Sequence, residues 1–252
     1  MNYERHAVMV AINQLVKVAC SIAIITIGIL LLWKTPSWEQ QATLREEVPT
    51  RLTTSLSKFE ERKFLRHVKT RLPQYREEFY LAGKKHKVPW VLLAAQAYQE
   101  SHWNRNAVSP TGVRGIMMLT LDTASDLGIT NRLDPRKSIS GGARYLARLY
   151  GNLPNDIQDP DRMYFALAAY NVGMGHIKDA QLLAQRLKKD ETRWDHIQTV
   201  LPLLAKKKYY KTLPNRYARG WEPVHYVKRI RAYHEILQYL EQQQSSFPTE
   251  EL

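Results

Sequence analysis

Residues 90–101 read Trp90-Val-Leu-Leu-Ala-Ala-Gln-Ala-Tyr-Gln-Glu100-Ser101, a stretch that is apolar as far as Ala97 and polar after it. Pro89 precedes the stretch, and this pattern predicts a helix that begins at Trp90. Glu100 then lies in the last turns, where the negative end of the helix dipole and apolar neighbours both disfavour a carboxylate. A carboxyl group that keeps its proton at neutral pH suits a general acid, although most glutamates near helix ends are solvated surface charges.

The sequence on both sides of this stretch predicts more helices and no series of strands. Upstream, apolar residues recur at helical spacing in 58–71 and 74–87, which Pro73 separates. Downstream, helices are expected at 120–128 with Thr120 as its cap, from Ser140 to about Gly151, from the 159–161 Asp-Pro-Asp turn through Tyr170, at 194–206 and at 222–243. An ordered loop is expected at 104–115. The predicted fold class is therefore all-α.

The chain has 252 residues, of which 44% are hydrophobic, and this suits one globular domain with an N-terminal attachment. Cys20 is the single cysteine, which excludes an internal disulfide and a cysteine-built metal site. We expect neither a metal nor a cofactor. The formal net charge of +13 favours anionic surroundings, such as phospholipid headgroups, a polyanionic wall polymer or nucleic acid, without choosing among them.

An uncharged apolar run at 18–33 lies between Lys17 and Lys34. It is shorter than the roughly 20 residues of a spanning helix, but the residues before it are mostly apolar and no small-x-small cleavage site follows closely. This favours one membrane helix, with the N-terminus inside and the body exported. We expect an anchor or uncleaved signal at 1–34, a polar tether at 35–57, a helical domain at 58–243 and a tail at 244–252.

Three further segments follow Glu100-Ser101 in a recognisable order. They read Gly115-Ile-Met-Met-Leu-Thr120, Ala168-Ala-Tyr-Asn-Val-Gly173 and Glu222-Pro-Val-His-Tyr-Val227. Together the four segments resemble the motifs of the lytic transglycosylase (SLT) domain, which has a goose-lysozyme-like helical fold. The stretches 109–115 and 140–145 are similar to the F type of membrane-bound lytic murein transglycosylases. The resemblance covers roughly residues 74–240.

The resemblance implies a substrate and a role for Glu100. The substrate is the β-1,4 bond between N-acetylmuramic acid and N-acetylglucosamine in peptidoglycan. Glu100 would protonate the glycosidic oxygen as an acid and then, as a base, take the proton from the muramic acid C6 hydroxyl, which closes a 1,6-anhydro ring. One carboxylate can serve both steps because the substrate's acetamido group stabilises the cationic centre.

The resemblance also implies sugar contacts, which we place at Ser101, Met117, Met118, Tyr170, Asn171 and Tyr226. A tyrosine hydroxyl near Glu100 can orient the carboxyl, and we expect Tyr170 to be that partner. Ordinary structural roles remain open for several of these residues. Tyr170 and Tyr226 also fit core positions, Asn171 fits a helix end, and Ser101 can contact sugar or satisfy the helix end.

Two departures from the family pattern stand out. Met118 occupies a position where the broad family commonly has a glutamine, which removes a sugar hydrogen bond but leaves a thioether that can pack on a pyranose ring. The F type also carries a solute-binding-like domain before the catalytic one, and residues 34–73 are too few to hold it. We therefore expect no regulation by that domain.

Three other functions remain to be weighed. A muramidase-like hydrolase of the same fold would need a second carboxylate to activate water, and none is evident. A non-catalytic peptidoglycan-binding scaffold would not need Glu100 as an acid. The basic segment 206–211 mixes lysines with tyrosines as nucleic-acid surfaces do, but it fits a solvated face or an anionic wall or membrane surface equally well. We expect peptidoglycan strands and the membrane as partners, no nucleic acid, and a periplasmic domain in a Gram-negative bacterium.

Overall fold

The computed structural model describes residues 56–110 and 112–246. Its helices are α4 (Lys58–Thr70), η1 (Leu72–Gln74), α5 (Arg76–His86), α6 (Trp90–Ser101), α7 (Leu121–Asp126), α8 (Pro135–Gly151), α9 (Asp161–Val172), α10 (Met174–Arg186), α11 (Trp194–Val200), η2 (Leu201–Ala205), α12 (Lys207–Tyr210) and α13 (Trp221–Ser246). Within these ranges there are isolated β-bridges and no strands. The predicted all-α class is confirmed.

The predicted membrane anchor at 1–34 and most of the tether at 35–57 lie outside the described residues. Among the residues that are described, no helix combines the length and the apolar character that crossing a bilayer requires. Most of the expected tail at 244–252 is also undescribed, although α13 continues three residues beyond the predicted end at residue 243.

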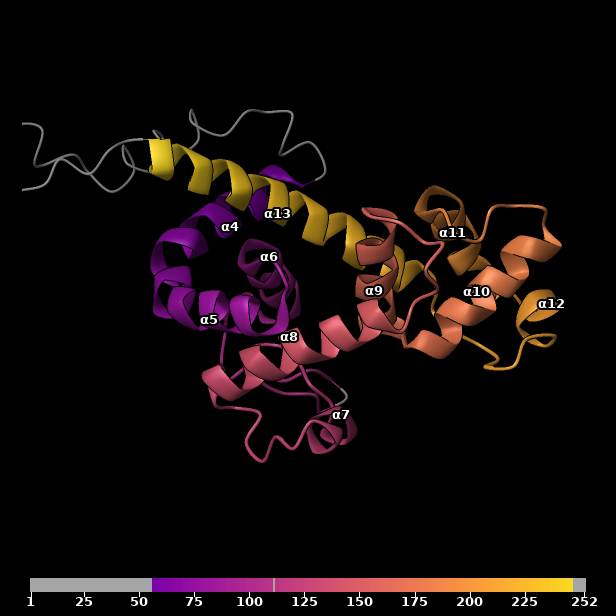
Figure 1. Cartoon of the computed structure of the whole chain (residues 1–252), viewed down its shortest axis with the longest axis horizontal. Coiled ribbons are helices and arrows are strands. Elements are labelled where there is room, and N and C mark those ends of the chain that lie inside the picture. The colour runs from indigo at the N-terminus through magenta and orange to yellow at the C-terminus, as the bar shows by residue number, and fades with distance from the viewer. Residues whose placement is uncertain (1–55, 111, 247–252) are drawn as a thin grey trace, which may run out of the picture. The chain divides into compact units, whose positions relative to one another are not determined.

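Helix α6 is held in a closed circuit of packed helices. It contacts α5 and α13; α5 contacts α8, α8 contacts α9, and α9 contacts α13. Figure 1 shows α13 passing above α6 and α8 passing below it. The residues of α6 from Leu92 to Tyr98 are all buried, because apolar residues cover every side of this short helix. The stretch that carries Glu100 is therefore the centre of the fold.

An aromatic cluster joins α4, near the start of the described chain, to the middle of α13. The ring of Tyr98 packs edge-on against Phe64, Trp103 and Tyr233, with centroid distances of 4.6, 4.7 and 4.8 Å. Such edge-to-face pairs contribute about 0.5–1.5 kcal/mol each beyond the area they bury. They fix α4, α6 and α13 against one another on the flank of α6.

Helix α8 starts earlier than the sequence indicates. We expected it to follow Ser140, whereas it begins at Pro135, with the side chain of Asp134 accepting a hydrogen bond from the Lys137 amide at 3.0 Å. Ser140 and the two glycines after it lie inside the helix, where they allow close packing against other segments. For α7 the predicted cap is confirmed, since the Thr120 side chain accepts from the Thr123 amide.

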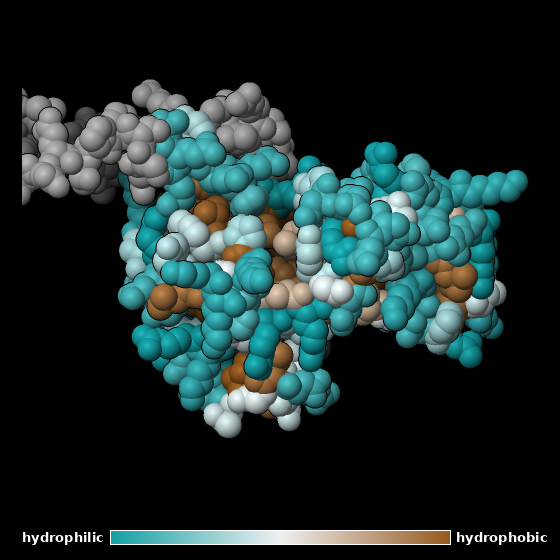
Figure 2. All heavy atoms as spheres, viewed as in Figure 1, coloured by the Kyte–Doolittle hydropathy of each residue, from teal (hydrophilic) through white to brown (hydrophobic). Residues whose placement is uncertain are grey.

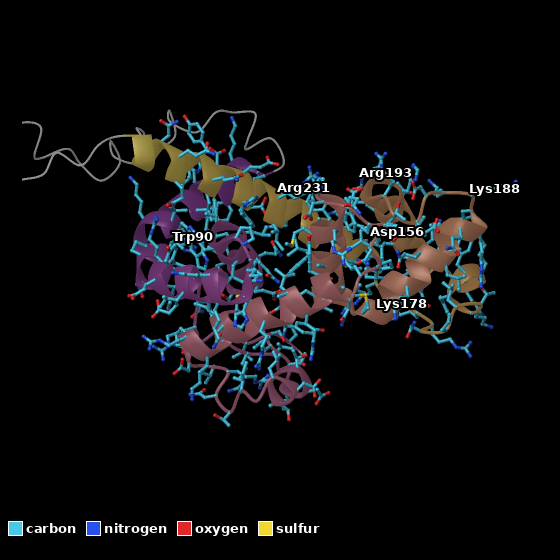
Figure 3. The ribbon with its side chains drawn as sticks, in the orientation of Figure 1. Trp90, Asp156, Lys178, Lys188, Arg193 and Arg231 are labelled. Carbon is cyan, nitrogen blue, oxygen red and sulfur yellow. The ribbon has the colours of Figure 1, made fainter. Side chains whose placement is uncertain are left out.

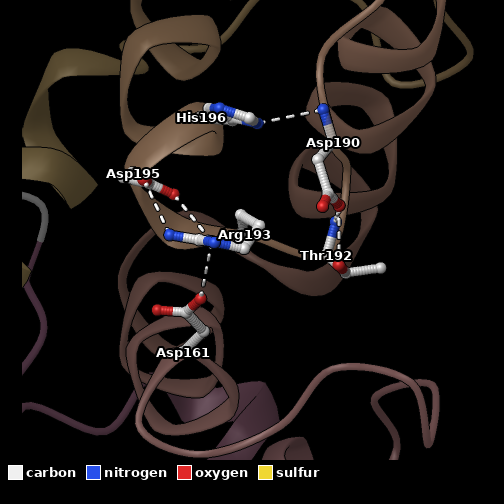
Figure 4. A network of polar contacts seen from close by, with 6 residues as sticks. All are labelled: Asp161, Asp190, Thr192, Arg193, Asp195 and His196. Atoms are coloured by element: carbon white, nitrogen blue, oxygen red, sulfur yellow. Dashed lines mark hydrogen bonds and ion pairs between the residues drawn. The ribbon is translucent and has the colours of Figure 1, made fainter.

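A second group of helices, α10 to α12, follows α9, and only part of this group was predicted. Helix α10 was not predicted, and the expected helix at 194–206 divides into α11 and η2, with Pro202 in the first turn of η2. Figure 4 shows one ion pair that joins this group to α9 and several contacts within the group. Arg193 lies 3.9 Å from Asp161 and 3.1 Å from Asp195, and the Asp190 amide donates to His196 Nδ1 at 3.0 Å.

Two glycines of α8 provide a matched test of this packing. A Cβ at position 142 would lie 2.6–2.9 Å from three side-chain atoms of Met117, whereas a Cβ at position 151 would meet nothing within 4 Å. We expect Gly142→Ala to lower the free energy of unfolding by about 1–3 kcal/mol through overpacking. Gly151→Ala should leave it unchanged or raise it by up to about 1 kcal/mol. Urea denaturation measures both, and equal effects would contradict the close approach.

Candidate active site

Glu100 is the next-to-last residue of α6, and the backbone beyond it is sharply turned. His102 and Trp103 both adopt left-handed φ values, 52° and 56°. The His102 amide donates to the Tyr98 carbonyl at 2.8 Å, and the Trp103 indole donates back to the Ala94 carbonyl at 2.9 Å. The helix therefore ends one residue after Glu100, and the fully buried Trp103 ring holds that end in place.

The hydroxyl of Tyr226, on α13, donates a hydrogen bond to Oε1 of Glu100. The same hydroxyl accepts a hydrogen bond from the buried Gln96 amide, at 3.3 Å. Gln96 and Glu100 are one turn apart on α6 and so face the same side of the helix. Tyr226 is buried, and burial raises its pKa well above the usual range, so it stays a hydroxyl donor.

Burial raises the pKa of Glu100 to about 8, and the hydrogen bond from Tyr226 acts in the opposite direction without overcoming it. Desolvation disfavours the charged carboxylate more than one hydrogen bond favours it. The Glu100 side chain is only partly exposed. At neutral pH the carboxyl group therefore keeps its proton.

Tyr170 does not make the hydrogen bond to Glu100 that we expected. Its hydroxyl donates to the Met117 carbonyl at 2.9 Å, and its ring lies 5.1 Å from that of Tyr145. The glutamate's tyrosine partner is Tyr226 instead. The sequence could not distinguish the two residues because both occur in motifs, and both lie on helices that pack beside α6 or its neighbours.

Three hydroxyl groups hold the segment 115–118 from three different helices. Ser101 of α6 donates to the Ile116 carbonyl at 2.8 Å, Tyr170 of α9 donates to the Met117 carbonyl, and Ser138 of α8 accepts from the Met117 amide at 3.3 Å. Buried backbone groups outside regular structure need such partners. We call these three contacts the hydroxyl clamp.

The clamp separates the predicted sugar contacts into two groups. Ser101 is 6% exposed and Met117 is fully buried, so neither side chain reaches the surface, and both support the site instead of lining it. Met118 is partly exposed, with a left-handed φ of 46°, and Asn171 is exposed at the end of α9. Met118, Asn171 and Glu100 therefore remain available to a ligand.

The surface near α6 is partly apolar. Figure 2 shows apolar surface recessed over α6, between α13 and α8. Among residues 56–110 and 112–246, no group of three or more His, Cys, Asp or Glu side chains is arranged to hold a metal ion.

Residues 78–193 match the family model described as the transglycosylase SLT domain. The match includes Glu100 and the second and third motifs.

The chain is also similar to curated proteins over a comparable region. The chain is 58% identical over 177 residues to membrane-bound lytic murein transglycosylase F 1 of Alkalilimnicola ehrlichii, covering 70% of this chain and 36% of the relative. It is 55% identical over 175 residues to membrane-bound lytic murein transglycosylase F of Maricaulis maris, covering 69% and 38%. The chain thus spans little more than a third of these relatives' length. A solved structure of the lytic transglycosylase Slt from Pseudomonas aeruginosa aligns with a TM-score of 0.47 at 21% identity, covering 69% of this chain and 25% of that one.

Two residues of the site were not anticipated. Gln96 was the one polar residue within the apolar run that ends at Ala97, four positions before Glu100, and that spacing was a usable signal. Ser138 offered no comparable signal, because its role depends on where α8 meets the segment 115–118.

The raised pKa of Glu100 predicts how stability depends on pH. Folded Glu100 has a pKa of about 8, whereas a solvated glutamate, as in the unfolded chain, has a pKa of 4.5. Its stabilising contribution is therefore complete below about pH 4.5 and is lost as the pH rises through about 8. Glu100→Gln cannot ionise, so it should be more stable than the wild type by about 2 kcal/mol or more at pH 8.

Urea denaturation of both proteins at pH 5 and pH 8.5 measures this difference. We expect the advantage of Glu100→Gln to grow with pH. A difference that stays constant would mean that Glu100 has an ordinary pKa. Glu77→Gln is a suitable control because Glu77 lies in the first turn of α5, outside the site.

Proposed function

We propose that the domain at 58–243 is a lytic transglycosylase that cleaves the β-1,4 bond between N-acetylmuramic acid and N-acetylglucosamine in peptidoglycan. The observation that carries the proposal is the protonated Glu100, hydrogen-bonded to Tyr226 at the end of α6. The SLT match and the relatives' names, which include murein, support the same substrate.

In the first step, Glu100 gives its proton to the glycosidic oxygen while the bond from that oxygen to C1 of muramic acid breaks. The acetamido group of the substrate stabilises the cationic C1. In the second step, the Glu100 carboxylate takes the proton from the C6 hydroxyl, whose oxygen bonds to C1 and forms the 1,6-anhydro ring. Glu100 ends protonated, as it began, and no water is consumed.

Tyr226 and the hydroxyl clamp would act by positioning. The Tyr226 hydroxyl stabilises the carboxylate that forms between the two steps, since its hydrogen bond favours the charged form. The clamp would hold Met118 against a pyranose face. We also propose membrane attachment through 1–34 and a periplasmic location in a Gram-negative bacterium, supported by the apolar run at 18–33 and by the words membrane-bound in the relatives' names.

The products test the reaction type directly. Purified murein is digested with the full-length protein in detergent, and the released muropeptides are weighed. We expect anhydro ends, one water lighter than hydrolytic ends, and a loss of activity of about 1000-fold or more in Glu100→Gln. Hydrated ends would identify a muramidase, and no release by a folded wild-type protein would favour a binding scaffold.

Tyr226→Phe tests the positioning role. Removing the hydroxyl removes the hydrogen bond that lowers the pKa of Glu100, so the alkaline limb of kcat/KM should move to higher pH. We expect the maximal rate to fall by about 10- to 100-fold, because the carboxylate loses its partner. Tyr170→Phe is the contrast: it weakens the clamp but should leave the alkaline limb in place. Identical pH profiles for wild type and Tyr226→Phe would show that Tyr226 does not position Glu100 or lower its pKa.

A further inference from the structure

A pocket of about 380 Å³ lies between α10 and the connection that leads from α8 to α9. Residues 152–155 form one wall, and Met174, Lys178 and Gln181 of α10 form the other. Figure 3 shows Lys178 on α10. Neither the SLT motifs nor the proposed reaction uses this pocket.

The pocket adjoins the end of the predicted substrate site. Met174 comes directly after Gly173, the last residue of the third motif, and lies three residues after the exposed Asn171. Three residues span at most about 11 Å, so one wall of the pocket begins within that distance of Asn171. A group attached to a strand bound at Asn171 can therefore reach the pocket.

Both walls are held in place before any ligand binds. Arg162 donates hydrogen bonds to the carbonyl oxygens of Leu153, Pro154 and Ile157 at 2.8, 2.7 and 3.2 Å. On the other side, the buried Asp179 accepts hydrogen bonds from the Asn215 amide and side chain, both at 3.0 Å. A preformed pocket loses little conformational freedom on binding.

The lining has a distinct chemistry. Lys178 contributes an exposed cation, no carboxylate is among the lining residues, and the side chains of Asn152, Asn155 and Gln181 contribute primary amides. The side-chain nitrogen of Gln181 donates to the Glu191 carbonyl at 3.2 Å, and its side-chain oxygen is an acceptor. Met174 and Leu153 add apolar surface. Such a lining fits an extended peptide with a carboxylate, since amides pair with peptide groups and an ammonium pairs with the anion.

We propose that this pocket binds the peptide that peptidoglycan carries on the lactyl group of muramic acid, with Lys178 pairing with a peptide carboxylate. The inference rests on the proposed function, because it takes the glycan strand as the molecule that passes Asn171. In an intact strand the lactyl carboxyl of muramic acid is joined to the peptide as an amide, so the free carboxylates that can pair with Lys178 belong to the peptide. The pocket thereby distinguishes peptide-bearing strands from bare ones.

The test uses the full-length chain in the Glu100→Gln background, so that binding is measured without cleavage. Titration calorimetry compares peptide-bearing glycan strands with chitin oligosaccharide strands, which have N-acetylated sugars and no carboxylate. Adding Lys178→Gln should weaken binding of the peptide-bearing strands about two- to fivefold, the upper range of one solvent-exposed ion pair. Binding of the chitin strands should be unchanged, and Lys178→Arg should restore most of the affinity.

Lys188→Gln is the matched control, because Lys188 is exposed beyond the end of α10 and does not line the pocket. It removes the same charge and should affect neither strand. Equal weakening of both strands by Lys178→Gln would make the pocket a sugar subsite, and no weakening of either would remove it from substrate binding. Either result overturns the proposal while leaving the reaction at Glu100 to be judged by its products.

Discussion

The hydrogen bond from Tyr226 to Glu100 joins the two helices on which the rest of the domain depends. Helix α6 is too short and too apolar to be stable alone, and burial against α13 and α5 stabilises it. The same burial removes water from Glu100 and raises its pKa to about 8. The stability of α6 and the raised pKa of Glu100 therefore have one physical cause, the burial of this helix. The hydrogen bond from Tyr226 lowers the free-energy cost of burying the polar carboxyl group.

Some residues of the four motif segments are accessible to a ligand, and others hold those residues in place. The hydroxyls of Ser101 and Tyr170 donate hydrogen bonds to backbone carbonyls of segment 115–118, and the Met117 side chain is buried. Motif residues need not touch substrate to matter, because a carboxyl acid works only if the bound molecule is placed within hydrogen-bond reach. The hydroxyl clamp sets the position of Met118 relative to Glu100.

Sequence reasoning reached the all-α class, the helix bearing Glu100, the cap of α7 and the direction of the pKa shift, because each depends on local pattern. It missed α10, whose start at Met174 follows a Gly173 that looks like a helix end, and it began α8 late because Gly141 and Gly142 look like a break. It also expected Tyr170 where the structure has Tyr226. Which of two tyrosines reaches a carboxyl depends on how α9 and α13 cross α6, and no local pattern encodes that.

The hydroxyl clamp draws its three groups from positions 101, 138 and 170, which lie on three separate helices. A fragment that lacks any one of α6, α8 or α9 leaves a buried backbone group of segment 115–118 without its partner. The conformation of this segment therefore depends on the joint packing of three helices that are far apart in the sequence.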